Sequence, residues 1–133
     1  MMRFMLDTNI VSDMVRHPQG RVAKRIAEVG ETLVCTSIIV AAELRCGAAR
    51  KGLPRLAGQL ESVLRAIAVL PLEAPVDVVY GALRARLDEV GQPIGANDLF
   101  LAAHALVLRC TLVTDNERDF SRIRALPVEN WLR

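Results

Sequence analysis

The chain has 133 residues, 52% of them hydrophobic, and its 17 Lys and Arg residues nearly balance 15 Asp and Glu residues. This composition excludes a disordered chain, because it supplies enough apolar side chain to bury a core. The longest apolar runs, 38–42 and 99–103, are too short to cross a bilayer, and a net charge of +2 does not by itself indicate nucleic-acid binding. We expect one cytoplasmic domain over residues 1–133, because Asp7 interrupts the N-terminal run where a signal peptide needs apolar residues.

Short apolar runs alternate with longer segments of helical period along the chain. In chain order, the sequence predicts a strand at 3–6, a helix at 21–29, a strand at 32–36 and helices at 37–51 and 54–67. There follow a strand at 68–70, helices at 75–90 and 97–109, and a strand at 111–114. This alternation predicts an α/β fold, in which helices cover both faces of a mainly parallel sheet.

The cysteines and histidines restrict the kind of metal site that the chain can build. The cysteines (Cys35, Cys46 and Cys110) are odd in number and far apart, so they indicate neither a disulfide framework nor a thiolate zinc site, and we expect them in the core. There are two histidines, and His104 lies in apolar helical sequence, where we expect a packing role. Any metal ion in this protein is therefore expected to have oxygen ligands.

Two aspartates directly follow predicted strands. Asp7 comes after the apolar residues 4–6, and Asp115 comes after 112–114. The carboxyl ends of parallel strands form the edge at which α/β proteins bind ligands, so both side chains are expected there. The alternative for each is that it caps the following helix, although Thr8 and Asn9 could cap the first helix equally well.

Two further acids lie in apolar helical sequence. Glu43 is expected to face the core, where a carboxylate needs either a cation or an ion pair, with Arg45, Arg50 or another arginine as the possible partner. Asp98 falls in the first turn of the most apolar helix, where the helix dipole alone could explain it and Asn97 is the expected cap.

Together these four isolated acids predict a common site. Neighbouring carboxylates raise one another's pKa, and a divalent cation allows them to stay ionised. Ligation by oxygen alone favours Mg²⁺ or Mn²⁺. A metal of this kind activates water for in-line attack on a phosphodiester, so the sequence predicts hydrolysis of phosphodiesters.

The motifs around the acids carry a resemblance that covers nearly the whole chain. They are Leu-Asp-Thr-Asn-Ile at 6–10, Ala-Glu-Leu at 42–44, Asn-Asp at 97–98, Thr-Asp-Asn at 114–116 and Asp-Phe at 119–120. In these residues the sequence resembles the VapC-type toxins of the PIN-domain ribonucleases. The segment 93–105 and Trp131 are similar to the subset of these toxins that cut tRNA.

The resemblance implies a PIN-like three-layer fold with a central, mainly parallel sheet of four or five strands. It also implies Mg²⁺- or Mn²⁺-dependent cleavage of RNA, with tRNA as the expected substrate, a homodimer, and inhibition by a VapB-like antitoxin that covers the acidic cleft. Asp7 and Asp98 are the implied principal metal ligands, and Asp115 is the implied fourth acid. Glu43 is expected to bind the metal or to orient the attacking water.

Residues beside the acids have smaller expected roles. Thr8 and Asn116 are expected to donate hydrogen bonds to the acids, and Asp119 is expected mainly to cap a local turn. Trp131 is expected to anchor the C-terminal tail. Four cations lie near one helix end: Arg45, Arg50, Lys51 and Arg55. They could guide RNA or contact the antitoxin, but the sequence favours the alternative that they form a solvated charged face.

Two other classes of protein compete with this interpretation. A phosphoaspartyl protein (a receiver domain or a haloacid-dehalogenase-like phosphatase) also carries Asp at the end of its first strand. It needs a lysine from a later element, however, and Lys24 and Lys51 lie on early helices. A non-catalytic PIN-fold docking module predicts the loss of acids, and all four are present.

Overall fold

A five-stranded sheet forms the centre of the computed structural model, which describes residues 3–133. Every strand pairing is parallel, and the strand order is β3-β2-β1-β4-β5. The strands are β1 (Arg3–Leu6), β2 (Val34–Ser37), β3 (Ala68–Leu70), β4 (Cys110–Val113) and β5 (Val128–Glu129). The α/β prediction is confirmed, and the order differs from the 2-1-3-4-5 order of flavodoxin-like proteins such as receiver domains.

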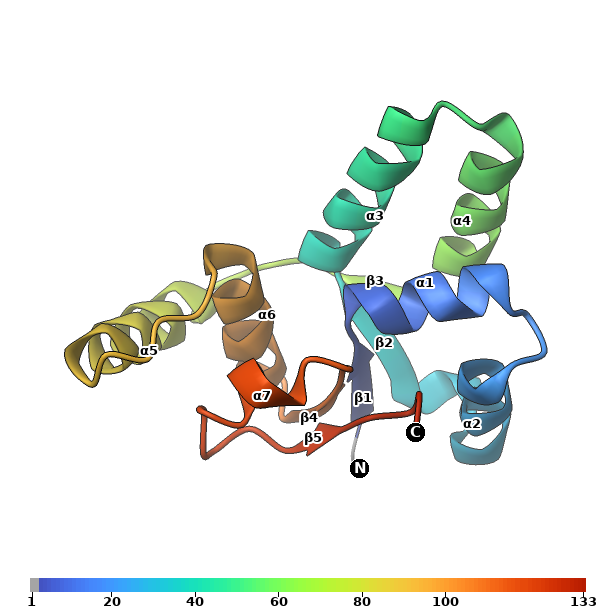
Figure 1. Ribbon diagram of the computed structural model, residues 1–133. Coiled ribbons are helices and arrows are strands. Elements are labelled where there is room, and N and C mark those ends of the chain that lie inside the picture. The colour runs from blue at the N-terminus through green and yellow to red at the C-terminus, as the bar shows by residue number, and fades with distance from the viewer. Residues whose placement is uncertain (1–2) are drawn as a thin grey trace.

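Helices form layers on both sides of this sheet (Figure 1). α1 (Thr8–Arg16) and α2 (Arg21–Val29) lie on one side, and α6 (Ala96–Val107) lies on the other, with α5 (Val76–Glu89) packed against it. α3 (Ile38–Lys51) and α4 (Pro54–Ala66) form a hairpin that projects beyond the carboxyl ends of the strands. The short α7 (Glu117–Phe120) follows β4. No helix within residues 3–133 is both long and apolar enough to span a membrane.

The observed elements agree with most predicted ones and differ at a few. The bounds of β1, α2 and β3 are those predicted, but a 3₁₀ turn (Glu31–Leu33) occupies the start of the predicted strand 32–36. The prediction in chain order omitted three elements. α7 and β5 are too short to show a period, whereas α1 has apolar residues at helical spacing (Ile10, Val11, Met14 and Val15) and was missed. The strand β5 has two residues and still extends the sheet. The Leu112 N–H donates to the Pro127 carbonyl oxygen and the Thr114 N–H donates to the Glu129 carbonyl oxygen, each at 2.9 Å.

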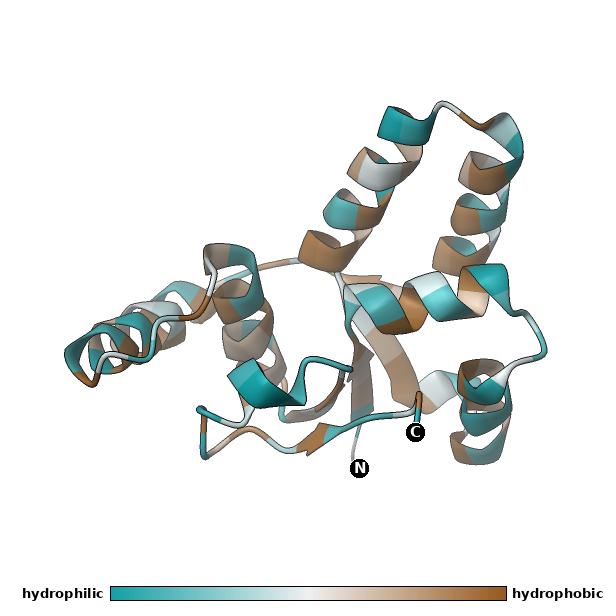
Figure 2. Cartoon of the chain, in the orientation of Figure 1, coloured by the Kyte–Doolittle hydropathy of each residue, from teal (hydrophilic) through white to brown (hydrophobic). Residues whose placement is uncertain are grey.

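The core lies between the sheet and its helices. The central strands and α6 are predominantly hydrophobic, whereas the outer helices present polar faces (Figure 2). Met5, Leu6 and Leu112 are fully buried. A second apolar cluster joins α1 to the hairpin of α3 and α4 through Val15, Ala41, Ala48, Leu60 and Leu64. The prediction that all cysteines lie in the core is wrong for Cys46, which is exposed on α3, whereas Cys35 and Cys110 are buried in strands.

The register of the sheet determines which side chains meet at its carboxyl edge. Leu6 of β1 pairs with Thr36 of β2 on one side and with Val113 of β4 on the other. The next residues along the three strands therefore emerge together: Asp7, Ser37 and Thr114. Because β1 is the central strand, Asp7 lies in the middle of this edge.

Truncation of a buried β4 side chain tests this core. Leu112→Ala is expected to lower the free energy of unfolding by about 2–5 kcal/mol, because it leaves a cavity beside the central strand. Val78, which is 68% exposed on α5, provides the control, and Val78→Ala is expected to change stability by less than about 0.5 kcal/mol. Urea unfolding measures both, and equal effects of the two substitutions would contradict the proposed core.

Candidate active site

Asp7 occupies the centre of the candidate site. Asp7 is 7% exposed. It is also the N-cap residue of α1, and Thr8 is the first helical residue, so the capping role that the sequence left open for Asp7 is present in the structure. Asp7 Oδ1 accepts a hydrogen bond from the Thr8 backbone N–H at 2.6 Å, and Oδ2 accepts one from the Thr114 hydroxyl at 2.7 Å. Burial raises the pKa of Asp7; these two hydrogen bonds oppose the rise, and the charges of Glu43 and Asp115 add to it.

Glu43 approaches Asp7 from α3. It is half-buried, and its Oε1 accepts a hydrogen bond from the Thr8 hydroxyl at 3.0 Å. The alternative of an ion pair with arginine is wrong for this structure, because Arg45 instead binds Glu61 through two hydrogen bonds of 2.9 Å, and no ion pair within residues 3–133 involves Glu43. The predicted role of Thr8 as a donor to the acids is confirmed twice, once by its backbone and once by its hydroxyl.

Asp115 lies on the other side of Asp7, in the loop after β4. The side chain is exposed, and Asn9 Nδ2 donates to both of its oxygens, at 3.0 and 3.2 Å. Asn9 belongs to the first turn of α1, so the helix that Asp7 caps also orients Asp115. The sequence interpretation did not assign these donor roles to Asn9 or Thr114. Their positions in the sequence could have indicated these roles, because Thr114 directly precedes Asp115 and Asn9 follows Asp7 by two residues.

Asp98 enters from the first turn of α6, on the opposite side of the sheet from α1. It is half-buried, and its pKa is raised to about 6, first by burial and then by the charges of Asp7, Glu43 and Asp119. The prediction that Asn97 caps this helix is wrong: α6 begins at Ala96 after the N-cap residue Gly95, which has no side chain to cap it. Burial is thus the main cause of the raised pKa of Asp98, and the neighbouring carboxylates add to it.

Asp119 belongs to both a local turn and the edge of this site. Asn116 Nδ2 donates to Asp119 Oδ2 at 3.2 Å, and Arg122 lies 3.5 Å from Oδ1, which fits the predicted turn-capping role. The charge of Asp119 also raises the pKa of Asp98. The prediction for Asn116 needs correction, since its amide binds Asp119 and not one of the four central acids.

The four acids are electrostatic neighbours, but their side chains do not converge on one point. Asp7 interacts with Glu43 and Asp115, and Asp98 interacts with Asp7 and Glu43. Within residues 3–133, no three Asp, Glu, His or Cys side chains are arranged closely enough to hold a metal ion. Most of the acids are instead held by individual donors on α1 and at the end of β4. The oxygen-only donor set and its excess negative charge nevertheless suit a divalent cation.

His104 lies outside the candidate site but contacts the start of α3, the helix that carries Glu43. It is 2% exposed, its Nδ1 lies 2.8 Å from the Ser37 hydroxyl oxygen, and burial lowers its pKa. Ser37 is the N-cap residue of α3 and accepts a hydrogen bond from the Ile39 backbone N–H at 3.2 Å. His104 therefore links α6 to the start of the helix that carries Glu43, which confirms its predicted packing role.

Comparison with known proteins identifies the family. The family model described as PIN domain matches residues 4–126. Ribonuclease VapC2 of Rickettsia felis is 36% identical to the chain over 132 residues, which is 98% of each protein. The tRNA(fMet)-specific endonuclease VapC of Shigella flexneri is 33% identical over 132 residues, covering 98% of this chain and 99% of the relative.

The chain belongs to the VapC family of PIN-domain proteins. Two solved structures of VapC-family complexes share its fold. VapBC2 from Rickettsia felis bound to a DNA fragment from its promoter has a TM-score of 0.90 at 33% identity. DNA-bound VapBC from Salmonella typhimurium has a TM-score of 0.91 at 30% identity. Each similarity covers 98% of this VapC-family chain and 99% of the other, so the expected PIN fold is confirmed.

Replacement of Asp98 by Asn is expected to stabilise the metal-free protein near neutral pH. The pKa of Asp98 rises from 3.8 to about 6 on folding, so the folded state binds this proton more tightly and stability falls as the pH rises through that window. The side chain is half-exposed, and solvent screening reduces the expected gain from Asp98→Asn to about 1 kcal/mol above pH ~7. The gain is expected to vanish toward pH ~3, below both pKa values, where Asp98 is largely protonated in both states.

Urea unfolding in EDTA at the two pH values measures this effect. Asp88→Asn is the matched control, because Asp88 is exposed on α5, 3.8 Å from Arg84. It is expected to change stability little at either pH. An equal gain from Asp98→Asn at both pH values would contradict the electrostatic origin.

Proposed function

We propose that this VapC-family protein is a divalent-metal-dependent endoribonuclease, the toxin of a VapBC-type toxin–antitoxin pair, with Asp7, Glu43, Asp98 and Asp115 in its active site. The observation that carries the proposal is the position of Asp7 at the carboxyl end of the central strand, with Glu43, Asp98 and Asp115 as its charged neighbours. A cluster of acids with perturbed pKa at the carboxyl ends of parallel strands is typical of a functional site. The names of the relatives, Ribonuclease VapC2 among them, support this chemistry.

The donor set fits Mg²⁺ or Mn²⁺. Asp7 and Asp98 are the proposed principal ligands, because both are at least half-buried and carry charge that lacks an ionic partner within residues 3–133. Glu43 on α3 and Asp115 in the loop after β4 are the remaining acids of the proposed metal-binding site. When bound, the metal supplies positive charge that activates water and stabilises the leaving oxygen of a phosphodiester.

The chain's own residues orient the acids for this reaction. The Thr114 hydroxyl and the Thr8 backbone hold the two oxygens of Asp7 in place, and the Thr8 hydroxyl holds Glu43. Glu43 has one carboxylate oxygen engaged by Thr8, and we assign its other oxygen the role of orienting the attacking water. Asn9 holds Asp115 toward the same edge.

The proposed substrate is tRNA. The Shigella flexneri relative is named a tRNA(fMet)-specific endonuclease, and the similarity to it covers 98% of this chain. The segment 93–105, which resembles that of the tRNA-cutting subset, leads into α6 and contains Asp98. This placement supports the proposal, because the segment would then lie beside the proposed active site.

The proposed inhibitor is a VapB-like antitoxin, and the protein is proposed to form a homodimer. VapBC complexes share the fold, which supports an antitoxin partner. A pocket of about 190 Å³ lies between α1, α3 and α4 beside Glu43. Its wall combines apolar side chains, Leu44 and Leu56 among them, with the cations Arg16 and Lys51, and we propose that an antitoxin segment binds there. The homodimer is proposed from the resemblance to the VapC-type toxins.

The nuclease is tested with antitoxin-free protein and total bacterial RNA. Wild type is expected to produce discrete cuts in tRNA with Mg²⁺ or Mn²⁺ and none with EDTA, and mapping of new 5′ ends by sequencing locates the cuts. Asp98→Asn is expected to lower the cleavage rate at least about 100-fold, since a metal ligand contributes several kcal/mol to the transition state.

Asp88→Asn is the control for this assay and is expected to cleave like wild type. Equal cleavage by wild type and Asp98→Asn, each purified twice, would show that the activity comes from a contaminant or another site. Absence of cleavage by wild type with either metal would overturn the proposed function.

A further inference from the structure

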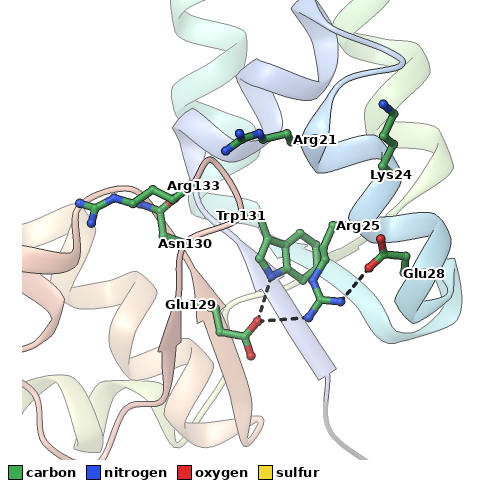
Figure 3. Close-up of a pocket in the computed structure, with 8 residues that line it drawn as sticks. All are labelled: Arg21, Lys24, Arg25, Glu28, Glu129, Asn130, Trp131 and Arg133. Atoms are coloured by element: carbon green, nitrogen blue, oxygen red, sulfur yellow. Dashed lines mark hydrogen bonds and ion pairs between the residues drawn. The ribbon is translucent and has the colours of Figure 1, made fainter.

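A basic groove lies outside the acidic site, between α2 and the C-terminal segment 128–133. It has a volume of about 480 Å³, and four cations and two carboxylates are among the residues that line it. Figure 3 shows Arg21 and Lys24 along the α2 side, Arg133 on the side of the C-terminal segment, and Trp131 between them. An open groove lined by charges differs from the apolar, enclosed pockets that bind small molecules.

The two carboxylates of the groove are already engaged. Arg25 lies 3.0 Å from Glu28 and 3.9 Å from Glu129, and Glu129 also accepts a hydrogen bond from the Trp131 indole N–H at 3.0 Å. The Arg25 guanidinium lies 5.6 Å from the centre of the Trp131 ring. The indole is neutral, so Arg25 offsets one of the two negative charges, and the four cations and two carboxylates leave the groove with a net charge of +2.

Three cations remain for a ligand. Arg21 donates to the Leu132 carbonyl oxygen at 3.2 Å, a contact that orients its guanidinium and leaves its charge unneutralised. Lys24 is exposed and forms no ion pair within residues 3–133. Arg133 lies 3.3 Å from Glu117 in a pair that is largely exposed, which contributes little energy and exchanges readily for a phosphate.

The groove is connected to the acidic site on two sides. Trp131 is buried against Phe4 of β1, with ring centres 5.2 Å apart, and Asp7 follows Phe4 by three residues, about 10 Å along an extended strand. Asn130 donates to Glu117 at 2.9 Å, and Glu117 begins the helix that follows the Asp115 loop. The groove therefore lies toward the amino end of β1, about 10 Å along the strand from the acids at its carboxyl end, and a substrate that reaches both has to follow the surface between them.

The chemistry of the groove complements that of the acids. A cluster of carboxylates repels a polyanion, so binding energy for a nucleic acid has to come from cations elsewhere on the surface. We propose, on the basis of the ribonuclease function above, that Arg21, Lys24 and Arg133 bind backbone phosphates of the RNA substrate on one side of the cleaved bond. Trp131 is 5% exposed and its N–H is engaged, so the groove contacts the backbone and offers no base-stacking surface.

The experiment compares RNA binding in an Asp98→Asn background, which keeps the RNA intact. Fluorescence anisotropy with labelled, unfractionated bacterial tRNA gives Kd over about 50–200 mM salt. Adding Arg21→Gln and Lys24→Gln is expected to weaken binding about tenfold at the lowest salt and to reduce the slope of log K against log salt by about 1.4 to 1.8, as for two lost phosphate contacts. In the Asp98 wild-type background, the same pair is expected to raise KM with kcat within about twofold of wild type.

Arg65→Gln with Arg86→Gln is the matched control, because both arginines are exposed and lie on α4 and α5, away from the groove. An unchanged Kd and slope for the groove pair, or an equal loss for the control pair, would overturn the inference. A groove pair that loses affinity for duplex DNA but not for tRNA would also overturn it and assign the surface to DNA. Cleavage by wild type separates the two proposals: its absence refutes the ribonuclease, whereas cleavage with an unchanged KM in the groove pair refutes the groove alone.

Discussion

The position of β1 at the centre of a parallel sheet is the constraint on which the site depends. Because Leu6 pairs with both Thr36 and Val113, the chain leaves β1 between the ends of β2 and β4, and Asp7 emerges at the middle of one edge. The helices α1 and α3 begin at that edge, and α6 brings Asp98 to it. A shift of one residue in this register would turn Asp7 away from Thr114 and separate it from the other acids.

Opposed electrostatic effects coexist at this edge. Burial and mutual repulsion raise the pKa of Asp7 and Asp98, whereas hydrogen bonds from Thr114 and Thr8 favour the ionised form of Asp7. Neutral hydrogen-bond donors therefore orient the carboxylate of Asp7, and no ion pair within residues 3–133 neutralises Asp7 or Asp98. This combination is suited to binding a cation, and its cost in stability is the kind of strain that functional sites retain.

The candidate acids and the cations of the basic groove occupy different parts of the surface, although the whole chain is nearly neutral. The acids gather at the carboxyl edge, while Arg21, Lys24 and Arg133 line the groove beside the C-terminal segment. Trp131 connects the two regions, since it packs against β1 and its neighbours bind the loop after β4. A surface divided in this way can hold a polyanion at one place and act on it at another.

The sequence by itself determined the fold class and most of the helices and strands, and it singled out the four acids as a candidate site, because apolar periodicity and charges in apolar segments are local signals. It did not reveal α7 or β5, which are too short to show a period, and it misassigned the cap of α6 and the position of Cys46. Tertiary structure decided the partners of the acids. Thr114 binds Asp7 although they are 107 positions apart in sequence, and Asn9 binds Asp115 across 106 positions. Arg45 pairs with Glu61 and not with Glu43. The basic groove likewise brings α2 together with residues 128–133. Such contacts depend on how strands pair and helices pack, and no local pattern encodes them.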